Sequence, residues 1–319
     1  MIEVTDLRKQ FGNLVAVDGV SLTVRRGEVL GFLGPNGAGK STTMKMITGF
    51  LAPTSGSIKI CGRALVEDPL AAKTRIGYLP EGAPAYGEMT PATFLDFIGD
   101  IRGLSRATKD LRVREVVAKI HLDGVLHQTI ETLSKGFKRR VGLAQAILHD
   151  PEILVMDEPT DGLDPNQKHE VRALIKEMSP TKGIIISTHI LEEVDAVCTR
   201  AAIIAKGRLL FSGTPTELAG RSRYHNAVTF SVDVGPAPEI VKTLQALAEV
   251  GAVEQASRDA ATVRITAFPR NRQAIFSTIE AASRHNSWSV HEMFVESGHL
   301  DEVFRSITTG TDNSEGHRT

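Results

Sequence analysis

The chain has 319 residues, of which 41% are hydrophobic and 24% are charged, and its formal net charge is -1. This length can bury a sizeable core and suggests about two domains. The near balance of charge argues against a broad binding surface for nucleic acid or anionic membranes. The two cysteines, Cys61 and Cys198, lie far apart and match no metal-ligand spacing, so we interpret them as reduced thiols.

The first residues show no basic segment followed by an apolar one, so we expect no secretory signal peptide. No uninterrupted apolar run approaches the roughly 20 residues that a helix needs to cross a bilayer. If the protein acts at a membrane, another chain must therefore supply the membrane-spanning part.

Residues 1–33 are expected to form short strands joined by turns, because apolar and polar residues alternate over 20–24. The last strand, 29–33, leads into a glycine-rich segment that matches the phosphate-binding loop pattern G-x-x-x-x-G-K-[ST]. Helical apolar spacing follows from Thr43. The expected phosphate-binding residues are Gly34, Pro35, Asn36, Gly37, Ala38, Gly39, Lys40, Ser41 and Thr42.

The chemistry of phosphate binding explains this pattern. Glycines let the backbone wrap closely around an anion, and the N–H groups and dipole of the following helix attract negative charge. Lys40 would reach the β- and γ-phosphates, and the Ser41 hydroxyl would bind Mg²⁺. The structural alternative is a chance glycine-rich turn, and the rest of the chain argues against it.

Strands are next expected at 57–60 and 76–79, and a largely helical region follows over about residues 88–147. Within that region the segment L-S-K-G-F at 133–137 introduces a helix. Ser134 has the residue type of an N-cap, so we expect the helix to begin directly after it.

Polar residues then follow two apolar runs. The run 153–156 is typical of a central parallel strand, and Asp157 and Glu158 come directly after it. Ligands meet α/β sheets at the carboxyl ends of strands. We therefore expect Asp157 to hold Mg²⁺ through its hydration shell and Glu158 to orient and deprotonate an attacking water. The run 184–186 ends near His189, for which we favour a contact with the γ-phosphate.

The character of the chain changes near Gly220. Residues 221–226 read as a polar linker, and the strands and helices beyond it are expected in the order βαββαβ, which is typical of a small ferredoxin-like sandwich. We expect no catalytic or metal site there, and the polar residues after Thr308 predict a disordered tail.

In this order, the motifs resemble those of the ATP-binding cassette (ABC) family, the nucleotide-binding subunits of ABC transporters. Residues 34–42 match the family's Walker A loop, 133–137 its signature and 153–158 its Walker B strand, and 162–164 look like its D-loop. The resemblance covers residues 1 to about 220.

The resemblance implies an α/β fold, in which a P-loop NTPase cassette combines a mixed sheet core with a helical subdomain. A small α+β ferredoxin-like domain would follow the cassette. The expected domains are the cassette at 1–220 with its helical subdomain at about 82–147, an accessory domain at 221–308 and a disordered tail at 309–319.

The resemblance also implies residue roles. His189 falls on the family's switch histidine, and Phe11 falls where the family stacks an aromatic ring on adenine. Ser134 and Gly136 carry the phosphate contact of the signature. The cofactors would be ATP and Mg²⁺.

Three residues depart from the family pattern. Lys135 and Phe137 stand where the signature usually has Gly and Gln, and Glu81 replaces the Q-loop glutamine. A carboxylate at that position could still bind Mg²⁺ or water. These variants and the segment 299–304 resemble a branch of exporter-type subunits that includes drug, sodium-ion and gliding-motility transporters.

The implied activity is ATP hydrolysis that energises export. In the family, two subunits pair about a two-fold axis, so that each ATP lies between one Walker A loop and the other signature. The expected partners are transmembrane subunits and a second copy of the chain or a paralogous ATP-binding subunit, without nucleic acid. The protein would be cytoplasmic and peripheral on the inner face of the cell membrane.

Two other classes remain open. One is an ABC-type ATPase that acts on chromosomes or ribosomes, but the chain has a single cassette and no room for a long coiled coil between Lys40 and Ser134. The other is a soluble regulatory ABC-type ATPase that is not coupled to transport and whose C-terminal domain senses a ligand.

Overall fold

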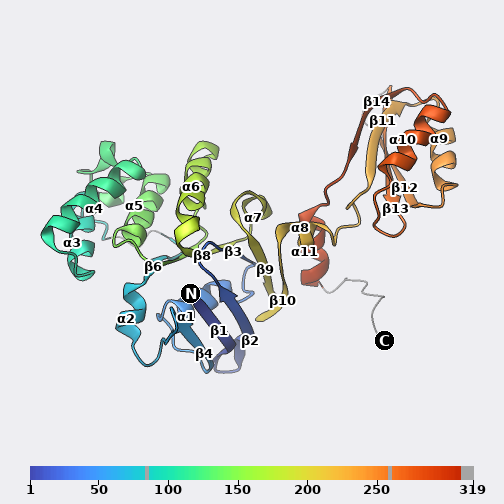
Figure 1. Ribbon diagram of the computed structural model, residues 1–319. Helices are drawn as coiled ribbons and strands as arrows, with labels where there is room; N and C mark the ends of the chain where they lie inside the picture. The colour runs from blue at the N-terminus through green and yellow to red at the C-terminus, as the bar shows by residue number, and fades with distance from the viewer. Residues whose placement is uncertain (83–85, 258–260, 310–319) are drawn as a thin grey trace. The chain divides into compact units, whose positions relative to one another are not determined.

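The computed structural model describes residues 1–82, 86–257 and 261–309. The chain divides into two compact units, Met1–Pro215 and Thr216–Thr319 (Figure 1). Thr309 ends the last helix, and the rest of the predicted tail, residues 310–319, lies outside the described residues.

The N-terminal strands form an antiparallel sheet in the order β2-β1-β4-β5. The prediction of short strands was wrong here, because β1 and β2 have 10 and 11 residues and pair along most of their length. Register shifts after Val4 and Leu7 let such long strands bend. The strands are β1 (Ile2–Phe11), β2 (Leu14–Val24), β4 (Ser55–Ile60) and β5 (Arg63–Ala64).

The central sheet has six strands in the order β10-β9-β3-β8-β7-β6. All neighbours are parallel except the β9–β10 hairpin, so the sheet is mixed, as predicted. Every residue of β3, β6, β7 and β8 is buried, which explains their unbroken apolar runs. The strands are β3 (Val29–Leu33), β6 (Ile76–Leu79), β7 (Ile153–Asp157), β8 (Gly183–Thr188), β9 (Arg200–Ala205) and β10 (Arg208–Gly213).

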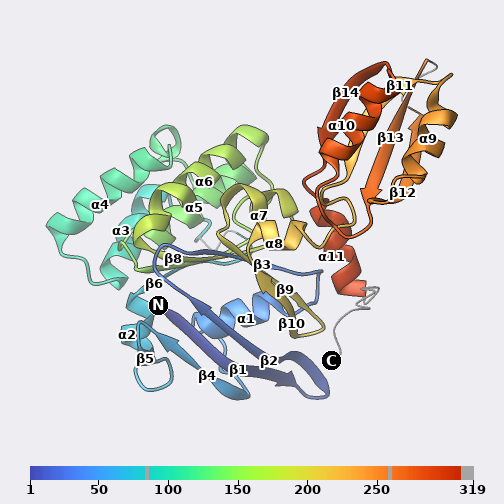
Figure 2. The same cartoon turned by 45° about the vertical axis from the view of Figure 1, so that its right-hand side comes forward.

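Helix α1 (Lys40–Ile47) lies between the N-terminal sheet and the central sheet (Figure 2). Its Met44, Met46 and Ile47 are fully buried in one hydrophobic core with residues of both sheets. This packing fixes the direction of the helix and therefore the position of its N-terminus. The remaining helices beside the central sheet are α2 (Pro69–Thr74), α6 (Pro165–Met178) and α7 (Leu191–Val197), with a 3₁₀ turn at Ser179–Thr181.

The predicted helical region consists of three helices that lie together (Figure 1). Their apolar residues share a second core with α6. The helices do not run on continuously, because Thr90, Ser105 and Ser134 each cap a new helix with a side-chain oxygen. They are α3 (Pro91–Ile101), α4 (Arg106–Lys119) and α5 (Lys135–Ile147), with 3₁₀ turns at Asp123–Val125 and Ile130–Thr132.

The C-terminal unit has the predicted βαββαβ order and an antiparallel sheet in the order β12-β13-β11-β14. Helices α9 and α10 bury Ile240 and Ile279 against Phe230 of the central strand β11. The elements are α8 (Pro215–Ala219), β11 (Val228–Asp233), α9 (Ala237–Gln245), β12 (Val250–Ser257), β13 (Thr262–Pro269), α10 (Phe276–His285), β14 (Val290–Val295) and α11 (Leu300–Thr309).

The segment that was predicted as a polar linker is tied into the C-terminal unit. Ser222 is completely buried, and its Oγ accepts hydrogen bonds from the N–H groups of Tyr224 (3.0 Å) and His299 (3.1 Å). The same hydroxyl donates to Glu302 of α11 at 2.5 Å. Composition suggested a linker because such long-range bonds leave no local pattern.

Within the described ranges, the chain contains no helix that is both long enough and apolar enough to cross a membrane.

Candidate nucleotide-binding site

The glycine-rich loop joins β3 to α1 in a conformation that needs glycine at two points. A Cβ atom on Gly34 would lie 2.4 Å from the carbonyl oxygen of Ile204, and one on Gly39 would lie 2.5 Å from that of Ala16. Gly39 also has a φ of 106°, in the left-handed region. The loop is therefore packed so closely that its N–H groups remain the surface presented to a ligand.

Lys40 is buried, with 6% of its surface exposed, and bends back over the loop. Its Nζ donates to the carbonyl oxygens of Gly34 (2.7 Å) and Pro35 (3.3 Å). Burial lowers the pKa of Lys40, and the charges of Glu158, Asp157 and Glu81 oppose that shift. The cation thus stands among the three carboxylates that the sequence singled out.

One pocket brings together most of the predicted site residues. Phe11, Glu81 and Glu158 line it together with most of the phosphate-binding loop, including Lys40 and Ser41. Phe11 is 47% exposed, so one face of its ring is available for stacking. Ser134 and Gly136 do not line this pocket.

Asp157, the last residue of β7, and Glu158 directly after it lie beside the end of β8, because the two strands are parallel neighbours with Asp157 opposite Ser187. Asp157 is 1% exposed, and its Oδ1 accepts a hydrogen bond from the Ser187 hydroxyl. Its Oδ2 is buried without a hydrogen-bond partner. A buried carboxylate oxygen left unpaired is costly, which indicates a place for a ligand.

Glu158 turns sharply out of the strand, with a φ of 50° that is unusual for a residue other than glycine. Its N–H donates to Ser187 O at 3.0 Å. Its Oε1 lies 3.0 Å from Nδ1 of His189, so the structure pairs the two residues predicted to act in hydrolysis. Glu158 is largely buried, whereas the side chain of His189 is 53% exposed.

These oxygen atoms suit Mg²⁺ that is held jointly by protein, phosphate and water. Over the part of the chain that the structure describes, no group of three His, Cys, Asp or Glu residues could hold a metal alone. Mg²⁺ commonly takes one or two protein ligands and fills the rest with phosphate and water. The unpaired Asp157 Oδ2, and the Ser41 and Glu81 side chains in the pocket lining, fit that mode of binding.

The signature segment forms a helix N-terminus, as predicted. Ser134 Oγ caps α5 by accepting from the N–H of Phe137 at 3.3 Å. A Cβ on Gly136 would lie 2.6 Å from Gln167 Oε1, so the helix packs closely on α6. Lys135 pairs with Asp161 at 2.9 Å, and this hydrogen bond lowers the pKa of Asp161.

Arg139 is a site residue that the sequence did not identify. This buried side chain donates to the carbonyl oxygens of Pro80 (2.8 Å) and Gly82 (2.9 Å). It also donates to the carbonyl oxygens of Asp157 and Glu158. Nothing in the sequence distinguishes it from its basic neighbours on either side.

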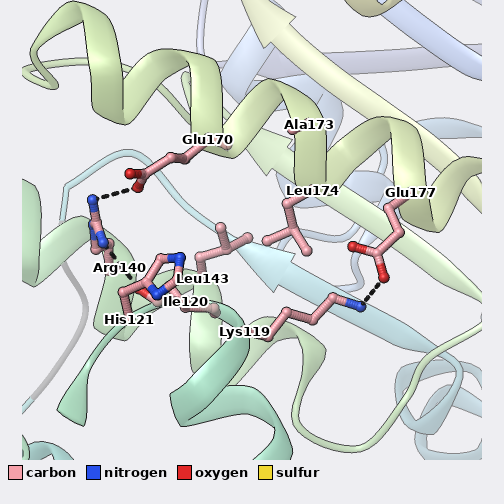
Figure 3. A pocket seen from close by; sticks show the side chains of 10 residues that line it. Lys119, Ile120, His121, Arg140, Leu143, Glu170, Ala173, Leu174 and Glu177 are labelled. Carbon is pink, nitrogen blue, oxygen red and sulfur yellow. Dashed lines mark hydrogen bonds and ion pairs between the residues drawn. The ribbon is translucent and has the colours of Figure 1, made fainter.

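A second pocket lies among α4, α5 and α6 and contains none of the predicted site residues (Figure 3). Ile120, Leu143 and Leu174 form its apolar part. Two ion pairs border it, Arg140–Glu170 at 2.7 Å and Lys119–Glu177 at 2.8 Å. Each pair joins the helical region to α6, so this pocket belongs to a seam between helices rather than to the nucleotide site.

Comparison with known proteins indicates an ATP-binding protein, as the geometry of the site does. A family model described as ABC transporter matches residues 17–161. The linearmycin resistance ATP-binding protein LnrL of Bacillus subtilis (strain 168) is 30% identical over 98% of this chain and 99% of its own length. The Nod factor export ATP-binding protein I of Ralstonia nicotianae (strain ATCC BAA-1114 / GMI1000) is 30% identical over 97% of this chain and 94% of its own length.

Solved structures agree. The ATP-binding subunit of an ABC transporter aligns with a TM-score of 0.64 and 33% identity over 68% of this chain and 91% of its own. The ATP-binding cassette MJ0796, solved as a dimer with ADP and Pi, aligns with a TM-score of 0.63 over 67% of this chain and 99% of its own length. Because the latter is only 22% identical, it supports the fold alone.

The fold and the loop therefore define a P-loop ATPase of the cassette type. The chain belongs to the ABC transporter family, and it is an ATP-binding subunit that hydrolyses ATP. The predicted family, fold and activity are confirmed. None of the relatives named above is described as a regulatory ATPase.

Proposed function

We propose that the chain energises export across the cell membrane and hydrolyses ATP with Glu158 as the general base. The arrangement beside Lys40 carries this proposal: Asp157, with its unpaired Oδ2, directly precedes Glu158, and the Glu158 carboxylate lies 3.0 Å from His189. Two of the relatives are described as a drug resistance protein and a Nod factor export protein, which favours export.

Each residue then has a defined task. The loop N–H groups and Lys40 bind the β- and γ-phosphates, and Phe11 stacks on the adenine. Asp157 and Ser41 hold Mg²⁺, with Glu81 nearby, and the bound ion would neutralise charge that develops on the phosphates. Glu158 accepts a proton from the attacking water, while His189 holds the carboxylate in place and contacts the γ-phosphate.

The signature completes the site from a second subunit. Ser134 and Gly136 stand at a helix N-terminus, an anion site, but do not line the chain's own nucleotide pocket. A second copy of the chain or a paralogous ATP-binding subunit would bring this helix to the γ-phosphate. ATP would then hold the dimer together, and hydrolysis would release it.

A groove beside the nucleotide pocket fits the transmembrane subunits. Phe50 and Tyr86 line it and are 73% and 57% exposed, respectively. Tyr78 also lines it, with a hydroxyl that is buried without a partner and a pKa raised by burial to about 12. Glu81 lines both the groove and the nucleotide pocket, so it connects ATP to this surface. The chain would thus lie in the cytoplasm, against the inner face of the membrane.

The test is Glu158→Gln, compared with Glu192→Gln, a change at an exposed glutamate. We expect Glu158→Gln to abolish ATP hydrolysis and to keep ATP binding, because the amide retains the shape but cannot accept the proton. Size-exclusion chromatography with ATP and Mg²⁺ should show a shift to a dimer. Hydrolysis near the wild-type rate would exclude Glu158 as the base.

A further inference from the structure

Helix α7 carries two adjacent glutamates with opposite environments. Glu192 is exposed, whereas Glu193 is only 2% exposed. Burial raises the pKa of Glu193, and hydrogen bonding from Thr188 opposes that shift. A buried carboxyl group is costly unless its oxygens are paired, so the partners of Glu193 indicate why it is there.

Each oxygen of Glu193 accepts a hydrogen bond from a different segment, one just after β7 and the other at the end of β8. Oε1 accepts from the hydroxyl of Thr160, and Oε2 accepts from the hydroxyl of Thr188 at 2.7 Å. Both threonines are buried, at 2% and 1% exposure. Thr188 Oγ1 also accepts from the N–H of Ile190 at 3.0 Å, so its proton is directed toward Glu193.

Both threonines are close in sequence to the residues proposed to act in hydrolysis. Thr160 follows Glu158 after one intervening proline, and Thr188 directly precedes His189. Glu158 and His189 are themselves paired at 3.0 Å. The two loop segments and the three side-chain hydrogen bonds therefore form a closed ring with Glu193 opposite the catalytic pair.

We propose that Glu193 is a positioning residue for ATP hydrolysis, which holds Glu158 and His189 in register by bridging Thr160 and Thr188. The inference rests on the roles proposed above for that pair. Glu193 is not among the residues that line the nucleotide pocket, so it acts through the two segments that carry Thr160 and Thr188.

The ring needs two acceptors on one side chain. A carboxylate offers both oxygens to the two hydroxyl donors, whereas a glutamine offers one acceptor and one NH₂ donor. Glu193→Gln keeps the volume of the side chain, but in one of the two hydrogen bonds the side chain must now donate instead of accept. Misplacement of a reacting group lowers the rate of the chemical step more than it lowers substrate binding.

The experiment measures kcat and KM for ATP in the full-length protein, for the wild type, Glu193→Gln and Glu192→Gln. We expect Glu193→Gln to lower kcat by about tenfold or more with KM unchanged. Glu192→Gln should match the wild type. An equal kcat for the two glutamine variants would overturn the proposal.

A hydroxyl series at Thr188 tests the same ring with changes that nearly keep the volume of the side chain. Thr188→Ser retains the donor and should keep kcat, whereas the isosteric Thr188→Val should lose about the factor that Glu193→Gln loses. The double variant Glu193→Gln/Thr188→Val should lose no more kcat than either single variant, because each single change already breaks the ring. Independent, multiplying losses would contradict the ring.

Glu158→Gln distinguishes failure of the proposed function from failure of the positioning role. If it stays active, the proposed role of Glu158 fails and the ring has no catalytic pair to position. If it is inactive while Glu193→Gln and Thr188→Val keep the wild-type kcat, only the positioning role of Glu193 is excluded.

Discussion

The two units of the chain differ in how they treat buried polar groups. Among the described residues, the buried side-chain atoms without hydrogen-bond partners belong to Tyr78, His149, Asp157 and Arg172, all in the unit Met1–Pro215. In the C-terminal unit, buried hydroxyls such as those of Ser222 and Thr229 are bonded within the unit itself. Native proteins leave few such groups unpaired. The cassette thus keeps an unpaired acceptor at Asp157 near its phosphate-binding loop, whereas these hydroxyls of the C-terminal unit stabilise that unit.

A large effect on the rate of hydrolysis is expected from removing the buried lysine of the phosphate-binding loop. Lys40→Ala should lower the rate of ATP hydrolysis by about 10²–10³-fold, because a positioned charge no longer faces the phosphates. An ATPase assay on the purified protein measures this, with the exposed Lys59→Ala as the control.

The same variant should not cost stability in the absence of nucleotide. Because burial lowers the pKa of Lys40, the unfolded state binds the proton more tightly, and stability rises as pH rises toward the lysine's ordinary 10.5. Lys40→Ala should remove that pH dependence. Urea unfolding at neutral and alkaline pH tests it, and a variant less stable than the wild type at neutral pH would argue that Lys40 serves the fold.

A matched pair of glycines, one in each unit, tests whether ATP binding depends on the cassette alone. Gly39 and Gly298 have φ values of 106° and 103°, and a Cβ on either would lie within 2.5 Å of a carbonyl oxygen. Each change to alanine should cost about 1–3 kcal/mol of unfolding free energy. Gly39→Ala should also abolish ATP binding, whereas Gly298→Ala should leave it intact. Nucleotide titration of both variants measures this, and equal affinities would contradict the division of roles.

The smallest effect on activity is expected at Ser222. Ser222→Ala removes one donor and one acceptor from the buried bonds to Tyr224, His299 and Glu302. We expect a loss of about 1–3 kcal/mol in unfolding free energy and an unchanged rate of ATP hydrolysis. Ser306→Ala, which removes only a bond within α11, is the control in the same denaturation assay.

The features that could be predicted from the sequence depend on contiguous residues. The phosphate-binding loop, the two acids at the end of β7 and the capping Ser134 are local patterns, because neighbouring residues set the geometry that each needs. The βαββαβ order could also be predicted, since each element has its own periodicity.

The rest depends on contacts between distant segments. Arg139 acts through residues 18 to 59 positions away, and nothing local shows which charge of its basic run is buried. Glu193 acts through residues 5 and 33 positions away. For Glu193 a signal did exist, because it stands four residues before the buried Val197, on the same face of α7. The lengths of β1 and β2 were missed because bulges break the alternation.

The buried guanidinium of Arg139 has a mechanical consequence. Its planar fork joins the segment after β6, the two acids at the end of β7 and the signature helix in which it lies. Because the three segments are bonded to one planar guanidinium group, they have little freedom to move independently. If the groove near Glu81 or the signature helix shifted, Glu158 would therefore move with it. The distances among the three segments would be retained.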